Sequence, residues 1–89
     1  MDERDLRLDG NAVAGLLAEA LTAEPTANMA SCAGCGASHQ LGALMAYVHG
    51  MGAVLRCPAC ERVMLRIGRG PGRLLLDLRG MRWLRVEQA

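Results

Sequence analysis

The 89-residue sequence contains no lysine and no phenylalanine, and only one tryptophan and one tyrosine. Because hydrophobic residues still make up 52% of the chain, we expect a folded protein with an aliphatic core. The formal net charge is only +1, well short of the positive charge of a strongly basic nucleic-acid-binding protein. The sequence also lacks paired carboxylates, a Ser/His/Asp arrangement and a glycine-rich phosphate loop. We therefore expect that it is not an enzyme.

Long apolar runs are missing as well. No stretch approaches about 18 uninterrupted apolar residues, so no membrane span is expected. The acidic start MDERDLRL differs from the basic start of a secretory signal. We expect a cytoplasmic protein, in which paired cysteines indicate metal binding or redox chemistry instead of structural disulfides. The length predicts one domain, of a size that often needs a disulfide, a metal or a partner for stability.

All four cysteines lie in two C-x-x-C pairs, Cys32 with Cys35 and Cys57 with Cys60. Each C-x-x-C turn can direct two thiolates at one point, and the length of the segment between the pairs is close to the usual spacing of a zinc module. Gly36 follows the first pair, where the backbone often adopts a left-handed conformation that glycine reaches without strain. The sequence therefore predicts one Zn²⁺ per chain, held by four thiolates. Such a metal is structural, because no coordination position remains for water.

Other metal chemistries remain possible from the sequence alone. A rubredoxin-like iron centre uses the same tetrahedral sulfur ligands, so an electron carrier stays open, although the aromatic core of rubredoxins is missing here. A thioredoxin-like centre is disfavoured because it needs one C-x-x-C at the start of a helix. His39 and His49 are interpreted as loop residues, since four cysteines already complete a metal site.

The hydrophobic period changes once along the chain. Residues 9–21 have the period of an amphipathic helix with Asp9 as its N-cap, and residues 22–31 are interpreted as a linker. The later segments alternate with a period of two, which predicts about four to five short strands. We therefore expect a small α+β metal-bound domain. Its N-terminal helix and linker occupy residues 1–31, and a zinc-ribbon antiparallel sheet occupies residues 32–89.

Two surfaces are candidates for binding a partner. The first is the apolar stripe of the helix, formed by Val13, Leu16, Leu17 and Leu21. It packs either on the chain's own sheet or in the groove of another protein. The second is a set of C-terminal arginines, of which the candidates are Arg62, Arg66, Arg79 and Arg82. They form either a solvated face or a contact with an acidic partner or a phosphate. We interpret Trp83 as the edge of the core.

These surfaces predict a protein-interaction or accessory module whose partner is another protein or a second copy of the chain. Nucleic acid is a less favoured partner, because Trp83 is the only aromatic residue among the C-terminal arginines. We expect neither a membrane nor a small-molecule substrate as a partner.

The order of the motifs LDGN, CAGCG, LRCPAC and LDLRG resembles that in a family of small zinc-ribbon proteins of GC-rich bacteria. The resemblance covers nearly the whole chain. It implies a zinc ribbon with the four cysteines as ligands, and it implies no established activity. It also implies that relatives are encoded near oxidoreductase genes, which would make an oxidoreductase the partner of an accessory subunit.

Overall fold

The computed structural model describes residues 7–21, 25–50 and 52–86. Within these residues the chain forms one α-helix, three short 3₁₀ helices and eight strands. The helical elements are η2 (Gly10–Val13), α1 (Ala14–Ala20), η3 (Pro25–Ala27) and η4 (Leu41–Ala43). The strands are β1 (Arg7–Asp9), β2 (Met29–Cys32), β3 (Ser38–Gln40), β4 (Met45–His49), β5 (Gly52–Arg56), β6 (Val63–Gly70), β7 (Arg73–Asp77) and β8 (Met81–Arg85). The predicted small α+β fold is confirmed.

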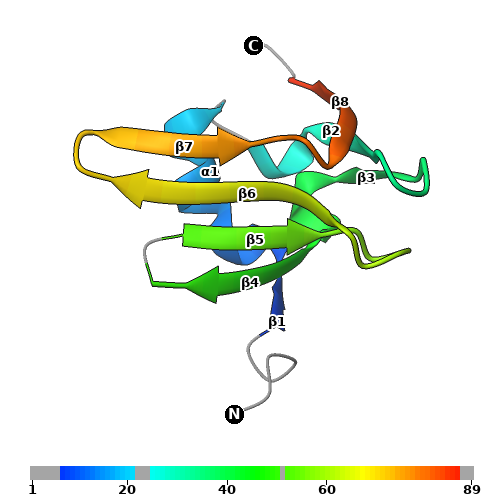
Figure 1. The fold of residues 1–89 in the computed structure, drawn as a ribbon, viewed down its shortest axis with the longest axis horizontal. Coiled ribbons are helices and arrows are strands. Elements are labelled where there is room, and N and C mark those ends of the chain that lie inside the picture. The colour runs from blue at the N-terminus through cyan, green and yellow to red at the C-terminus, as the bar shows by residue number, and fades with distance from the viewer. Residues whose placement is uncertain (1–6, 22–24, 51, 87–89) are drawn as a thin grey trace.

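The described strands form two antiparallel sheets, where the sequence predicted one sheet of about four to five strands. The larger sheet has the order β1-β4-β5-β6-β7, and the smaller has the order β3-β2-β8. Figure 1 shows α1 behind the larger sheet, and the smaller sheet beside one end of it. Strands β4 and β5 form a hairpin, in which His49 pairs with Gly52. The additional strands are β1, β2 and β3, which are too short to give a clear alternating pattern.

The apolar stripe of the helix packs on the chain's own core. Val13 and Leu17 are buried, and Leu16 and Leu21 are partly buried against the same cluster. The helical segment begins as a 3₁₀ turn, in which Asp9 accepts a hydrogen bond from the backbone of Asn11. Of the two arrangements that the sequence left open, the structure shows the one in which the stripe packs on the chain itself. In the part of the chain that the structure describes, no helix is long and apolar enough to cross a membrane.

The segment predicted as a linker belongs to the fold. Residues 22–24 lie outside the described residues, but the rest of the segment contains η3 and most of β2. Strand β2 is the central strand of the smaller sheet, and its Ala30 is fully buried opposite Leu84 of β8. The linker prediction is therefore wrong for residues 25–31. A strand of four residues carries too little periodicity to be detected from its own sequence.

A β-bulge interrupts the alternation predicted for β6. Leu55 of β5 faces Leu65, and Arg56 faces Val63, which leaves Met64 as an extra residue in β6. Met64 and Leu65 are both buried, whereas strict alternation would place Met64 on the face of the arginines. An extra residue of this kind bends the strand and redirects its side chains. The bulge lies directly beside the second cysteine pair.

Candidate metal centre

The first cysteine pair lies in a turn that connects β2 to β3. The backbone N–H of Cys32 donates to the carbonyl of Ala37 at 2.8 Å, and the N–H of Gly36 donates to the carbonyl of Cys32 at 2.9 Å. The backbone N–H of Gly34 also donates to the Cys32 sulfur at 3.3 Å. Gly36 has a φ of 79°, as the sequence predicted for the residue after the pair. These hydrogen bonds close the turn and hold the Cys32 sulfur in place.

The second pair forms the same turn between β5 and β6. The N–H of Cys57 donates to the carbonyl of Arg62 at 2.8 Å, and the N–H of Glu61 donates to the carbonyl of Cys57 at 2.7 Å. Glu61 takes the position of Gly36 and has a φ of 65°. This conformation could not be predicted from the residue type, because a residue with a side chain rarely adopts it. The two turns are therefore structurally equivalent.

The four sulfur atoms converge on one point. They all lie within 4.8 Å of one another. The Sγ atoms of Cys32 and Cys60 are 3.6 Å apart, and those of Cys35 and Cys57 are 3.7 Å apart. Sulfur ligands about 2.3 Å from a tetrahedral metal ion lie about 3.8 Å from each other, whereas a disulfide bond requires about 2.05 Å. The residues therefore fit a single tetrahedral metal ion, and in each close pair the two sulfurs come from different turns.

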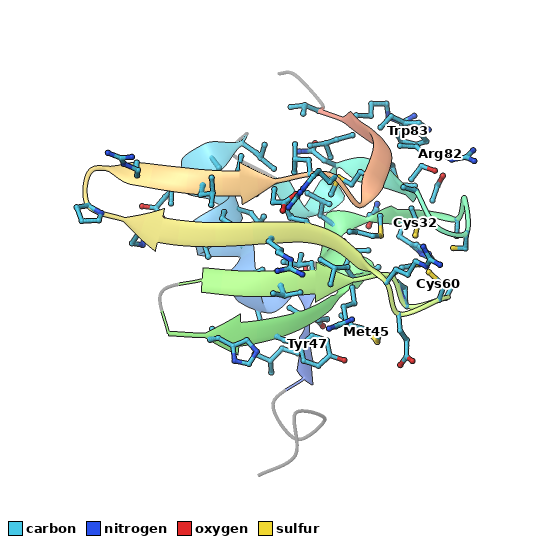
Figure 2. All side chains as sticks on the ribbon, viewed as in Figure 1. Cys32, Met45, Tyr47, Cys60, Arg82 and Trp83 are labelled. Carbon is cyan, nitrogen blue, oxygen red and sulfur yellow. The ribbon has the colours of Figure 1, made fainter. Side chains whose placement is uncertain are left out.

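The centre lies at one end of the molecule, near the surface. Figure 2 shows Cys32, the last residue of β2, and Cys60 near each other at that end. Cys32 and Cys57 are buried, Cys60 is half-buried and Cys35 is exposed. A bound ion would therefore be shielded from solvent on the side of the sheets and accessible past Cys35.

His39 lies closer to the centre than the sequence predicted. It belongs to β3, and its Nε2 atom is 3.9 Å from the sulfur of Cys57. Because the four sulfurs alone could supply every ligand of a tetrahedral ion, His39 is a neighbour of the cluster and is not needed as a ligand. His49 is exposed, but it is the last residue of β4, so neither histidine is the loop residue that the sequence predicted.

The thiol pKa values of Cys32 and Cys60 are shifted in opposite directions. Burial raises the pKa of the Cys32 thiol, but the backbone N–H groups of Cys35 and Gly34 outweigh it and lower the value to about 7. The backbone N–H of Arg62 lowers the pKa of Cys60, but burial and the neighbouring sulfurs together raise it to about 11. Four thiolates at this separation repel one another, so their full ionisation requires a cation between them.

Residues outside the pairs hold the turns in place. The guanidinium of Arg56 donates to the carbonyl of Glu61 at 2.9 Å. The carbonyl of Gly80 accepts a hydrogen bond from the Ala33 N–H at 2.9 Å. A Cβ atom at Gly80 would lie 2.6 Å from the Cα of Met64, so only glycine allows this approach to β6. The turn before β8 is thus fixed between the first cysteine turn and the larger sheet.

The candidate arginines do not all share one surface. Arg66 is exposed on the outer face of the larger sheet, where it pairs in register with Asp77. The Nε atom of Arg79 donates to the same carboxylate at 2.9 Å and holds the pKa of Asp77 well below its usual range. Arg62 extends across the first cysteine turn, since its Nε atom would lie 3.0 Å from a Cβ on Gly34. A single arginine face is therefore not formed by these three residues.

Arg82 and Trp83 lie on β8 beside the cysteine turns. Ser31 faces Trp83 while Cys32 faces Met81, so Arg82 is the extra residue of a second β-bulge. Both Arg82 and Trp83 are exposed, and 45% of Trp83 is accessible to solvent. Figure 2 shows them at the end of the molecule that carries Cys32. Trp83 was predicted to be the edge of the core. The bulge explains its exposure, because it alters the direction of neighbouring side chains.

Comparison with known proteins identifies one family. The model of DUF6510, described as a family of unknown function, matches residues 2–89, which is nearly the whole chain. The comparisons with curated proteins and with solved structures gave no match. The function must therefore be inferred from the cysteine turns and from the exposed residues near them.

Proposed function

Since the chain belongs to DUF6510, a family of unknown function, we propose from its own residues that it is a non-catalytic zinc-ribbon protein and a protein-interaction module. The convergence of four cysteine sulfurs from two equivalent turns carries this proposal. Tetrahedral thiolate ligands suit Zn²⁺ or iron. With four protein ligands, zinc has no open position for a catalytic water, so its role is structural.

The position of the two turns explains why such a metal would matter for stability. One turn connects β2 to β3 in the smaller sheet, and the other connects β5 to β6 in the larger sheet. A metal ion held by both turns therefore cross-links the two sheets. Binding of structural Zn²⁺ contributes roughly 10–16 kcal/mol in small peptides, which is comparable with the whole stability of a typical domain, about 5–15 kcal/mol. Folding of the chain would then depend on the metal.

Zinc and iron are distinguished by colour. Thiolate-to-iron charge transfer absorbs visible light, so a rubredoxin-like centre would make the purified protein red. Zn²⁺ has no such transitions because its d shell is filled. A colourless protein that contains zinc supports the structural role. A red protein with iron would replace it with electron transfer.

The interaction surface that we propose is centred on Arg82 and Trp83. Tryptophan and arginine are the residues most enriched among those that dominate binding energy in protein interfaces. The metal centre would hold this part of β8 in place, because β8 pairs with β2, the strand that ends in the ligand Cys32. A partner surface rich in carboxylates is favoured, since arginine binds carboxylates with two parallel hydrogen bonds. The resemblance described above makes an oxidoreductase the first partner to test.

The test compares two charge reversals of the zinc-loaded protein. Arg82→Glu should abolish binding to the partner, while Arg66→Glu on the outer face of the larger sheet should leave it unchanged. Binding is measured by co-purification with the candidate oxidoreductase, followed by titration calorimetry. Equal binding by the wild type and both variants would place the interface elsewhere, and loss only in Arg66→Glu would move it to the sheet face.

The exposure of Trp83 beside Arg82 also favours a second candidate function, binding of single-stranded nucleic acid. An exposed aromatic ring next to an arginine provides a stacking surface for bases. Such binding would weaken steeply as salt increases, and it would be lost in Trp83→Ala. An absence of binding at low salt would eliminate this function.

A further inference from the structure

Strand β7 is an open edge of the larger sheet. It pairs with β6 on one side, and no other strand of the described residues pairs with it. Figure 1 shows β7 at the outer edge of that sheet. Three consecutive leucines occupy its centre, and Leu75 is 70% exposed. Edge strands are usually protected by charges, proline, a bulge or a covering segment. Residues 74–76 contain none of the protecting residues, so this edge is suited to accept another strand.

The backbone groups available at this edge follow from the turn between β6 and β7. The turn contains two residues, so the residues that flank it form a hydrogen-bonded pair, and such pairs then alternate along the hairpin. The N–H and carbonyl groups of Arg73, Leu75 and Asp77 therefore point toward β6. Those of Leu74 and Leu76 point toward the open edge, where they can bond to a strand added there.

We propose that the strand added to this edge is β7 of a second copy of the chain, in an antiparallel dimer with Leu75 at its two-fold axis. Leu75 then faces Leu75 of the second copy, and Leu74 faces its Leu76. The outward backbone groups of Leu74 and Leu76 form the hydrogen-bonded pairs. Arg73 faces Asp77 of the second copy, so opposite charges lie in the pairs where cross-strand side chains are closest.

Charge complementarity selects this register. Because the sequence of β7 is RLLLD, reversal about its central leucine exchanges the arginine with the aspartate, and two-fold symmetry forms the ion pair twice. An axis at Leu74 would place Arg73 opposite Leu75, and an axis at Leu76 would place Asp77 opposite Leu75. In both of these registers a charge lies opposite a leucine.

The remaining contacts of Asp77 are compatible with the dimer. Its carboxylate bonds to Arg79, whose side chain is 91% exposed, so this guanidinium can stay in place while Arg73 of the second copy approaches. The two larger sheets would become continuous, and exposed Leu75 would gain Leu75 of the second copy as its cross-strand neighbour. This inference goes beyond the proposed function. It concerns β7 and a second copy, whereas the proposed function concerns β8 and a different protein.

Charge exchange tests the register directly. Sedimentation equilibrium of the metal-loaded chain should show a dimer that dissociates on dilution. Each single variant, Arg73→Asp or Asp77→Arg, places like charges opposite each other at two positions of the symmetric dimer. Each should therefore weaken self-association at least about tenfold. The double variant restores opposite charges and should recover most of the affinity. Leu75→Asp should also dissociate the dimer, because it places the aspartate carboxylates of the two copies opposite each other at the two-fold axis.

Val48→Asp is the matched control for Leu75→Asp, since Val48 is also exposed but lies on β4. It should leave the dimer intact. Metal content and thermal melting of every variant establish that it is folded, which separates failure of the dimer from failure of the metal centre. A wild type that stays monomeric at its highest soluble concentration would overturn the proposal. So would a dimer that tolerates Leu75→Asp, or a double variant no tighter than the single ones.

Discussion

The equivalence of the two cysteine turns predicts opposite effects for two exchanges at matching positions. Gly36 and Glu61 both have positive φ values, 79° and 65°. A residue with a Cβ atom in this region is strained by about 1–2 kcal/mol. Against this, glycine in the unfolded chain loses about 0.4–1 kcal/mol more on folding than alanine does. The strain is the larger effect, so glycine should be the more stable residue at both positions.

Gly36→Ala should therefore lower the free energy of unfolding by about 0.5–1 kcal/mol. No atom other than its chain neighbours lies within 4 Å of a Cβ at Gly36, so the cost comes from the backbone alone. Glu61→Gly should raise the free energy of unfolding by a similar amount. Glu61→Ala is the control, because it removes the carboxylate and retains the strain. It should stay within about 0.5 kcal/mol of the wild type.

Urea unfolding at a fixed concentration of free metal measures these differences, since metal binding to the folded state shifts apparent stability. In a domain of this size, 1 kcal/mol also corresponds to a change of about 4–8 °C in Tm. If Gly36→Ala were neutral and Glu61→Gly destabilising, the two turns would not share one backbone conformation. Loss of stability in Glu61→Ala would instead assign a stabilising role to the carboxylate.

Three further predictions test the framework around the centre. Gly80→Ala should lower the free energy of unfolding, measured in urea, by about 1–3 kcal/mol, because the added Cβ would meet the backbone of β6. Gly15→Ala should instead raise it by about 0.5–1 kcal/mol, since no atom lies within 4 Å of a Cβ at Gly15. A neutral Gly80→Ala would contradict the close approach. Leu17→Ala should lower the free energy of unfolding by about 2–5 kcal/mol, because Leu17 is fully buried. A loss below about 1 kcal/mol would show that the helix does not pack as described. Cys57→Ser should lose the metal and the cooperative melt seen by circular dichroism, and an unchanged Tm would argue against a structural metal.

The cysteine cluster and the helical stripe were predictable from the sequence because their signals are local. Two C-x-x-C pairs specify four thiols whatever the surrounding fold, and Leu17 falls on the apolar side of a helical period. The bulge at Met64 was not predictable in this way, since an extra residue in β6 is defined only against its partner strand. The conformation of Glu61 was also hidden. It follows from the hydrogen bonds of its turn and from Arg56, not from its residue type.

The short motifs at the two ends of the sequence acquire structural explanations. In LDGN, Asp9 caps η2, and a Cβ at Gly10 would lie 2.9 Å from the Cα of Gly42. In LDLRG, Asp77 accepts a hydrogen bond from the backbone N–H of Arg79 at 3.1 Å, and Gly80 approaches β6. Both motifs place a turn with an aspartate cap before a glycine that contacts another backbone.

The central claim is that one zinc ion held by four thiolates joins the two sheets. The most direct test is the metal content of protein purified without added metal, with reactive thiols counted before and after a chelator. We predict one zinc per chain, four thiols that react only after chelation, and loss of the cooperative melt when the metal is removed. Iron in place of zinc, two disulfides without metal, or an unchanged melt after complete removal of the metal would contradict the claim.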